Sequence, residues 1–102
     1  MPLTKGFKET VKERMERSPK FRRALLREAI ECLLSGDVDT GKSILRDYIN
    51  GTIGFEELSD RTHTPAKSLM RMFGPKGNPQ AENLFDVIAT LQQAEGVQFQ
   101  LR

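Results

Sequence analysis

The chain has 102 residues, which suffice for one domain with a modest core and leave little room for a second. Its 37% hydrophobic and 29% charged residues are typical of a folded, largely helical protein and exclude a disordered chain. The formal charge of +2 is too small to identify a partner, so the distribution of charge matters more than its sum.

Positive charge is concentrated in two places. Residues 1–35 hold nine Lys and Arg against five Glu, whereas residues 36–102 hold seven against nine acids. Within that acidic second part, four cations lie between Asp60 and Asn78 with no acid among them (Arg61, Lys67, Arg71 and Lys76). The second cluster therefore marks a candidate surface for an anionic partner.

Metal and membrane chemistry have little support. The single Cys32 excludes an internal disulfide and, with the single His63, cannot form a zinc site. Because Cys32 lies among apolar residues, we expect a buried core thiol. No apolar run approaches the roughly 18–20 residues of a membrane span, and the N-terminus lacks a signal-peptide core. We expect a cytoplasmic protein with no cofactor and no membrane partner.

Three helices are predicted before residue 51. A charged segment, 4–17, has a narrow apolar stripe. Ser18-Pro19 is a strong helix-start signal for a second helix that ends near Gly36, and a third fits 39–50. We interpret 1–35 as an N-terminal helical extension packed on the core and, because of the patterns after residue 51, 36–102 as a helix-turn-helix DNA-binding domain with a C-terminal strand.

The second half predicts three further helices and a strand. Two short helices fit 54–61 and 65–73, and a turn at 74–77 precedes a helix capped by Asn78, opened by Pro79 and ended by Gly96. The tail 97–102 alternates apolar and polar residues, which predicts a half-buried strand. Such a strand needs a partner from a second copy or another protein. The alternative is a frayed tail lying over the core.

The two short helices match a helix-turn-helix. With the turn at His63, Leu58 and Leu69 fall where two crossed helices share apolar contacts, and Thr64 is placed to cap the second helix. The side chains at the start of that helix then point outward, where they can contact bases or phosphates. The predicted DNA-binding residues are Thr64, Pro65, Ala66, Lys67, Ser68, Arg71, Lys76 and Asn78. The alternative is a plain helical hairpin with a solvated cationic face.

The segment LSDRTHTPAKSLMRMFGPKGNPQAENLFDVIATLQQAEGVQFQL resembles the lambda-repressor-like (Xre-type) helix-turn-helix of addiction-module antitoxins. The resemblance covers about residues 52–101, and Gly77-Asn78-Pro79 is its most distinctive part. His63 departs from the usual turn glycine, and Pro65 from the usual serine. The resemblance implies an all-α, lambda-repressor-like bundle whose short C-terminal β-strand is used in dimerisation.

The function implied by the resemblance is a transcriptional repressor that binds its own promoter and neutralises a toxin. Its partners would be double-stranded DNA with a palindromic operator, a second copy of the chain, and a cognate toxin. Two alternatives stay open: a protein-binding module that neutralises a toxin without DNA binding, and a stand-alone Xre-type regulator. An enzyme is not expected, because no convergent catalytic set is present.

One motif points elsewhere. Residues 36–43, GDVDTGKS, satisfy the phosphate-loop pattern GxxxxGK[ST]. However, a helix rather than a strand is predicted before it, and Asp37 and Asp39 would repel a triphosphate. We therefore interpret the motif as a helix stop at Gly36 followed by a capped start near Asp39.

Overall fold

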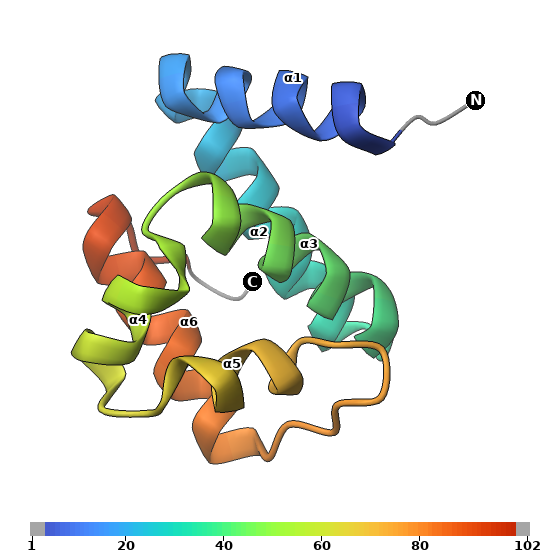
Figure 1. Cartoon of the computed structure of the whole chain (residues 1–102), viewed down its shortest axis with the longest axis vertical. Helices are drawn as coiled ribbons and strands as arrows, with labels where there is room; N and C mark the ends of the chain where they lie inside the picture. Colours follow the sequence, from blue (N-terminus) through green and yellow to red (C-terminus); the bar gives the residue numbers. More distant parts are fainter. Residues whose placement is uncertain (1–3, 100–102) are drawn as a thin grey trace.

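The computed structural model describes residues 4–99, and their side chains from residue 11 onward. Six helices fold into one bundle (Figure 1): α1 (Thr4–Arg17), α2 (Pro19–Leu34), α3 (Val38–Gly51), α4 (Gly54–Thr62), α5 (Ala66–Met72) and α6 (Ala81–Glu95). No β-strand occurs among these residues, so the all-α class is confirmed and the predicted C-terminal strand is wrong.

The ends of the first helices follow from local chemistry. The Ser18 hydroxyl accepts a hydrogen bond from the Phe21 amide at 3.1 Å, which caps α2 with Pro19 in its first turn. Gly36 ends that segment with a φ of 94°. The Asp37 carboxylate then accepts from the Thr40 amide at 3.4 Å, so α3 begins at Val38, slightly earlier than expected.

Helices α2 and α3 form the middle of the core. A Cβ atom added at Gly41 would lie 2.7 Å from side-chain carbons of Leu33, so glycine is needed for their close approach. Every helix from α1 to α6 contributes to one buried apolar cluster. Its members are Met15, Leu26, Ala29, Leu45, Tyr48, Ile49, Phe55, Leu58, Leu69, Phe73, Val87, Ile88 and Leu91.

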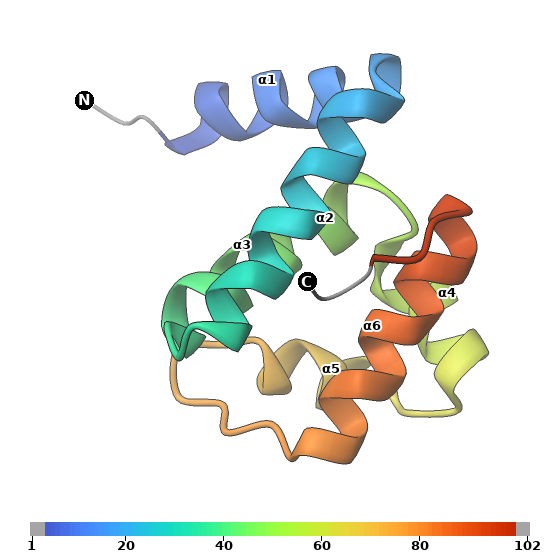
Figure 2. The ribbon, with the colours of Figure 1, turned by 180° about the vertical axis from the view of Figure 1, so that it is seen from behind.

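Helix α1 packs against the C-terminal end of α3. The Met15 side chain is 1% exposed and lies directly over Gly51, where any larger residue would collide with it. Both views of the ribbon place α1 at one end of the molecule and α5 at the other (Figures 1 and 2). The first and fifth helices therefore present separate surfaces.

The tail after α6 folds back onto the bundle. Gly96, with a φ of 76°, ends α6. The Phe99 amide then donates to the Gln92 side-chain oxygen at 2.9 Å, and the Phe99 ring packs against the core with the Arg27 guanidinium 5.8 Å from its centre. A strand needs a second strand for its backbone groups, whereas here the bundle itself covers the apolar side chain. Leu101, part of the predicted strand, lies outside the described residues.

Within residues 4–99, no helix has the length and apolar content that crossing a membrane requires.

Candidate nucleic-acid interface

Helices α4 and α5 form a compact helix-turn-helix unit. Leu58 of α4 is fully buried and Leu69 of α5 is 1% exposed, as the apolar pattern predicts. The rings of Phe55 and Phe73 meet with their centres 6.4 Å apart in a tilted arrangement. These contacts fix the second helix against the first.

The turn between the two helices depends on His63. This residue has a φ of 59° and a ψ of 30°, and it is the one non-glycine residue with a positive φ in residues 4–99. Its amide donates to the Ser59 carbonyl at 2.8 Å, which closes the end of α4. The prediction that histidine holds a left-handed turn here is confirmed.

The starts of α5 and α6 differ from the predictions. Helix α5 begins at Ala66, Pro65 stands at its N-cap position in an extended conformation, and no side chain caps it. Thr64 therefore has no capping role. Helix α6 begins at Ala81, two residues beyond Pro79, and Asn78 does not cap it. Since proline disfavours the helical region in the residue before it, Thr64 and Asn78 stay outside the helices, and each helix begins after its proline.

The outer face of α5 carries polar and cationic side chains. Lys67, Ser68 and Arg71 are exposed, while Ala66 is partly buried. The opposite face is held in the core by Leu69. Thr64 is partly buried and Pro65 is exposed, directly before the helix.

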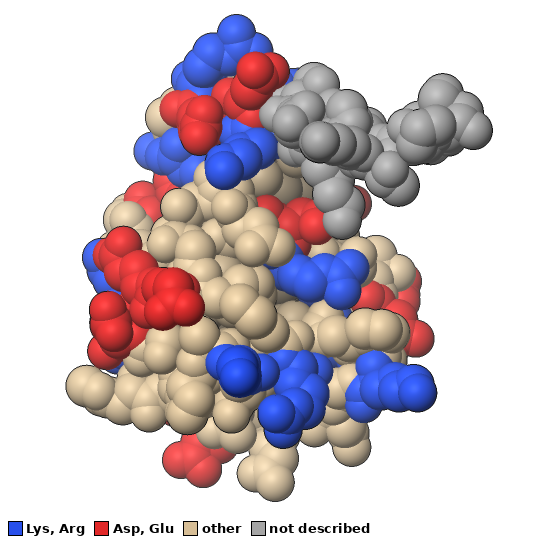
Figure 3. All heavy atoms as spheres, viewed as in Figure 1, with Lys and Arg blue, Asp and Glu red and all other residues tan. Residues whose placement is uncertain are grey.

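Only three of the four cations in this region are free of an ion pair in the described structure. The Arg61 guanidinium bonds the Glu57 carboxylate one turn earlier on α4 at 2.6 Å. Among residues 11–99, no ion pair involves Lys67, Arg71 or Lys76. Several lysine and arginine side chains lie over the end of the molecule where α5 and the following loop lie, with acidic side chains around them on both sides and at the lower edge (Figure 3).

The loop after α5 carries the remaining predicted contacts. Lys76 and Asn78 are both exposed, on either side of Gly77. The Gly77 amide donates to the Gly74 carbonyl at 3.0 Å, so residues 74–77 form a closed turn, as predicted. The structure thus brings α5 and this loop to one end of the molecule.

The phosphate-loop pattern has a different basis. Gly36 ends a helix, Gly41 lies inside α3, and Lys42 points into the protein with 4% exposure. No strand leads into the motif, and its lysine is not accessible to a ligand phosphate. Residues 36–43 thus form a helix stop at Gly36 followed by the start of α3, as predicted from the sequence.

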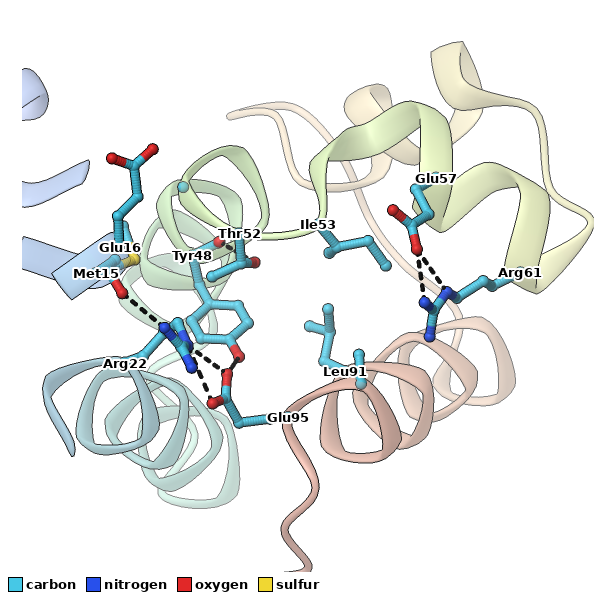
Figure 4. A pocket seen from close by; sticks show the side chains of 12 residues that line it. Met15, Glu16, Arg22, Tyr48, Thr52, Ile53, Glu57, Arg61, Leu91 and Glu95 are labelled. Atoms are coloured by element: carbon cyan, nitrogen blue, oxygen red, sulfur yellow. Dashed lines mark hydrogen bonds and ion pairs between the residues drawn. The ribbon is translucent and has the colours of Figure 1, made fainter. Parts of the chain in front are cut away.

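The structure also contains an open cleft of about 370 Å³, bounded by α1, α2, α3, α4 and α6 (Figure 4). At one side, Arg22 bonds both carboxylate oxygens of Glu95 at 2.9 and 3.0 Å and the Met15 carbonyl at 2.8 Å. The Tyr48 hydroxyl donates to the same carboxylate at 2.5 Å. The Glu57–Arg61 pair stands on the other side, with Ile53 and Leu91 between. Arg22, Tyr48 and Glu95 therefore form one hydrogen-bonded cluster in which the two charges are already paired.

This Arg22–Tyr48–Glu95 cluster changes the acidity of its members. Burial acts to raise the pKa of Glu95, but hydrogen bonds from Arg22 and Tyr48, together with the nearby arginine charges, outweigh it and leave that pKa below its ordinary value. Burial and the bond to Glu95 raise the pKa of Tyr48. The bond to Glu95 likewise raises the pKa of Arg22. The carboxylate stays ionised and joins α2, α3 and α6.

Two further observations concern Cys32 and possible metal ligands. Cys32 is partly exposed on α2, so the expectation of a buried thiol is wrong. No group of three or more potential metal ligands occurs in the part of the chain that the structure describes.

Sequence patterns do not identify Lys42 or the Arg22–Tyr48–Glu95 cluster as structural partners. Arg22 and Glu95 are 73 positions apart, so no local spacing signals their contact. The only available signal for Lys42 is a cation within an apolar helical face. Comparisons with protein-family models, with curated proteins and with solved structures found no match to this chain.

Proposed function

We propose that this chain is a sequence-specific DNA-binding repressor, acting as the antitoxin of a type II toxin–antitoxin module that regulates its own operon from the cytoplasm. The observation that carries the proposal is the outer face of α5, where Lys67 and Arg71 are exposed and form no ion pair with residues 11–99, while Leu69 anchors the helix. A helix held in this way, after a tight turn, suits insertion into a major groove. No catalysis is required of it.

The exposed residues divide into two roles. Arg71, Lys67 and Ser68 are placed to hydrogen-bond base edges, and Pro65 and Ala66 to touch thymine methyl groups. Lys76, Asn78 and Thr64 flank that helix and serve the phosphate backbone, which fixes the register of the protein on DNA. A homodimer would present two copies of α5 to adjacent major grooves about 34 Å apart on a palindromic operator.

The separation of α1 from α5 supports a second partner. A toxin bound near α1 would leave the α5 face free, because the two helices lie at opposite ends of the molecule (Figures 1 and 2). The C-terminal end of α1 carries exposed charges of both signs, Glu13, Glu16 and Arg17, which suits a polar surface on the partner.

The test is operator binding by Arg71→Ala. If Arg71 reads a base edge, we expect the free energy of binding to weaken by roughly 1–3 kcal/mol, with relaxed preference at one base pair. Gel-shift titrations on the promoter sequence and on a scrambled duplex measure both effects. The matched control is Arg46→Ala, since Arg46 lies on α3, outside the proposed interface.

Equal affinity of Arg71→Ala and the unchanged protein on both duplexes would remove Arg71 from the interface. Toxin neutralisation by a protein with no preference between the duplexes would favour the protein-binding module. A repressor whose promoter adjoins no toxin gene would favour the stand-alone regulator.

A further inference from the structure

The strongest unexplained feature is the buried charge of Lys42. Lys42 is 4% exposed, comparable among residues 11–99 with the Glu95 side chain at 5%, which is paired with Arg22. It lies in the first turns of α3, yet it points toward the loop that follows α5. A charge in such a place is unfavourable unless its donors are satisfied.

The partners of Lys42 are backbone carbonyls and not a carboxylate. Its Nζ donates to the Gly74 carbonyl at 3.1 Å and to the Gly77 carbonyl at 2.7 Å. No ion pair in the described part of the chain includes Lys42. A single ammonium group therefore joins two points of one turn, across 32 and 35 positions of sequence.

The same turn is pressed against the end of α5. A Cβ atom at Gly77 would collide with the Arg71 carbonyl and would lie 2.5 Å from the Met72 carbonyl. The ammonium group also stands near the C-terminal end of α5, where a positive charge is favourable. The position of the turn thus depends on two things: glycine at 77 and the cation beneath it.

We propose that Lys42 is a positioning residue for DNA binding, whose buried ammonium ties α3 to the 74–77 turn and holds Lys76 toward the phosphate backbone. The inference rests on the proposed function and adds a part to it. The lysine never touches DNA, but it sets the place of a residue that does. A neutral side chain would leave the Gly77 carbonyl without a donor and the Gly74 carbonyl with the Gly77 amide alone, and the turn would move to reach water.

The first test is a double-mutant cycle between Lys42→Met and Lys76→Ala in operator binding. Each single variant is expected to weaken binding roughly tenfold, the loss of one charge-assisted contact. Each should also reduce the slope of log affinity against log salt by about 0.9, the effect of one phosphate. In the Lys42→Met background, Lys76→Ala should add almost nothing. Additive losses would overturn the proposal.

A matched control separates positioning from general stability. Ile49→Val removes one methyl group from the same helix at a fully buried site far along α3. In that background, Lys76→Ala should keep its full effect on affinity and salt slope. Loss of the Lys76 effect in this control as well would overturn the proposal.

Amide hydrogen exchange tests the tie without DNA. The Gly77 amide, bonded to the Gly74 carbonyl, should exchange at least tenfold faster in Lys42→Met and unchanged in Ile49→Val. Should Lys42→Met fail to fold, Lys42→Gln, which keeps a shorter donor, is measured in its place with the same expectation. If the Gly77 amide exchanges at an unchanged rate in the Lys42 variant, the proposed contact between Lys42 and the turn does not hold the turn in place, and the proposal is overturned. If the unchanged protein protects this amide but binds the promoter and scrambled duplexes equally, the proposed function is overturned instead.

Discussion

His63 shows how one residue can set the angle between two helices. It ends α4 in the left-handed region, and α5 starts three residues later. The residue type is unusual there but tolerated, because histidine, like asparagine and aspartate, adopts a positive φ more readily than a β-branched residue. The sequence allowed this prediction since the apolar spacing of Leu58 and Leu69 leaves only a few positions for the turn.

We expect His63→Gly to raise the free energy of unfolding by about 0.5–1 kcal/mol, because glycine adopts a positive φ without a Cβ contact. His63→Val should lower it by about 1–2 kcal/mol, since a β-branched residue is strained in this region. Urea denaturation followed by circular dichroism measures both. A glycine variant less stable than the unchanged protein would show that the imidazole supplies a contact that outweighs the strain.

At the scale of elements, prediction succeeded where signals are local. The Ser18-Pro19 start, the Gly36 stop and the Gly96 stop each lie within a few residues of the helix end they determine. The tail after Gly96 was predicted wrongly, because alternation describes a chain with one covered face and does not say what covers it. Phe99 meets the bundle in place of a second strand. The DNA-reading role of α5 stays a prediction.

The Glu95 carboxylate joins α2, α3 and α6 through contacts that no local sequence pattern predicts. Its lowered pKa makes the stability of the folded protein depend on pH. The pKa of Glu95 is lower in the folded protein than its ordinary value of 4.5. The ionised Glu95 carboxylate therefore stabilises the folded protein fully at pH values above 4.5. This stabilisation is lost as the pH falls through the lowered pKa of the folded state.

Glu95→Gln should therefore lower the free energy of unfolding by roughly 1–3 kcal/mol at neutral pH, the range for hydrogen bonds to a charged group. The difference from the unchanged protein should shrink as the pH falls below 4.5. Glu31→Gln is the matched control, because Glu31 pairs with Arg27 on an exposed surface and should change stability little. Chemical denaturation at a series of pH values decides; a pH-independent difference would contradict the ionised cluster.

At the scale of the whole molecule, the proposed homodimer needs an interface. The sequence predicted dimerisation through a C-terminal strand, and residues 4–99 contain no strand, so another surface must serve. Phe85 on α6 is 59% exposed, and Ala81 and Ala89, one turn to either side, are exposed as well. A large side chain between two small ones can pack against its own copy about a two-fold axis. The start of α6 lies beside α5 (Figures 1 and 2), so a contact between copies in this part of α6 would form at the same end of the molecule as α5.

We expect Phe85→Glu to convert a dimer to a monomer in light scattering coupled to gel filtration, and to weaken binding to a palindrome more than binding to a single half-site. Leu34→Glu is the control, because Leu34 is similarly exposed, at 54%, but lies on α2. A dimer that persists in Phe85→Glu would place the contact between copies elsewhere.

The position of α3 has one more consequence. Its last residue, Gly51, supports Met15 of α1, and its early Lys42 supports the turn beyond α5. The helix has 14 residues and so spans about 21 Å as one stiff strut. A partner bound to α1 and DNA bound beside the 74–77 turn would therefore both lie against parts of the molecule that this one helix supports.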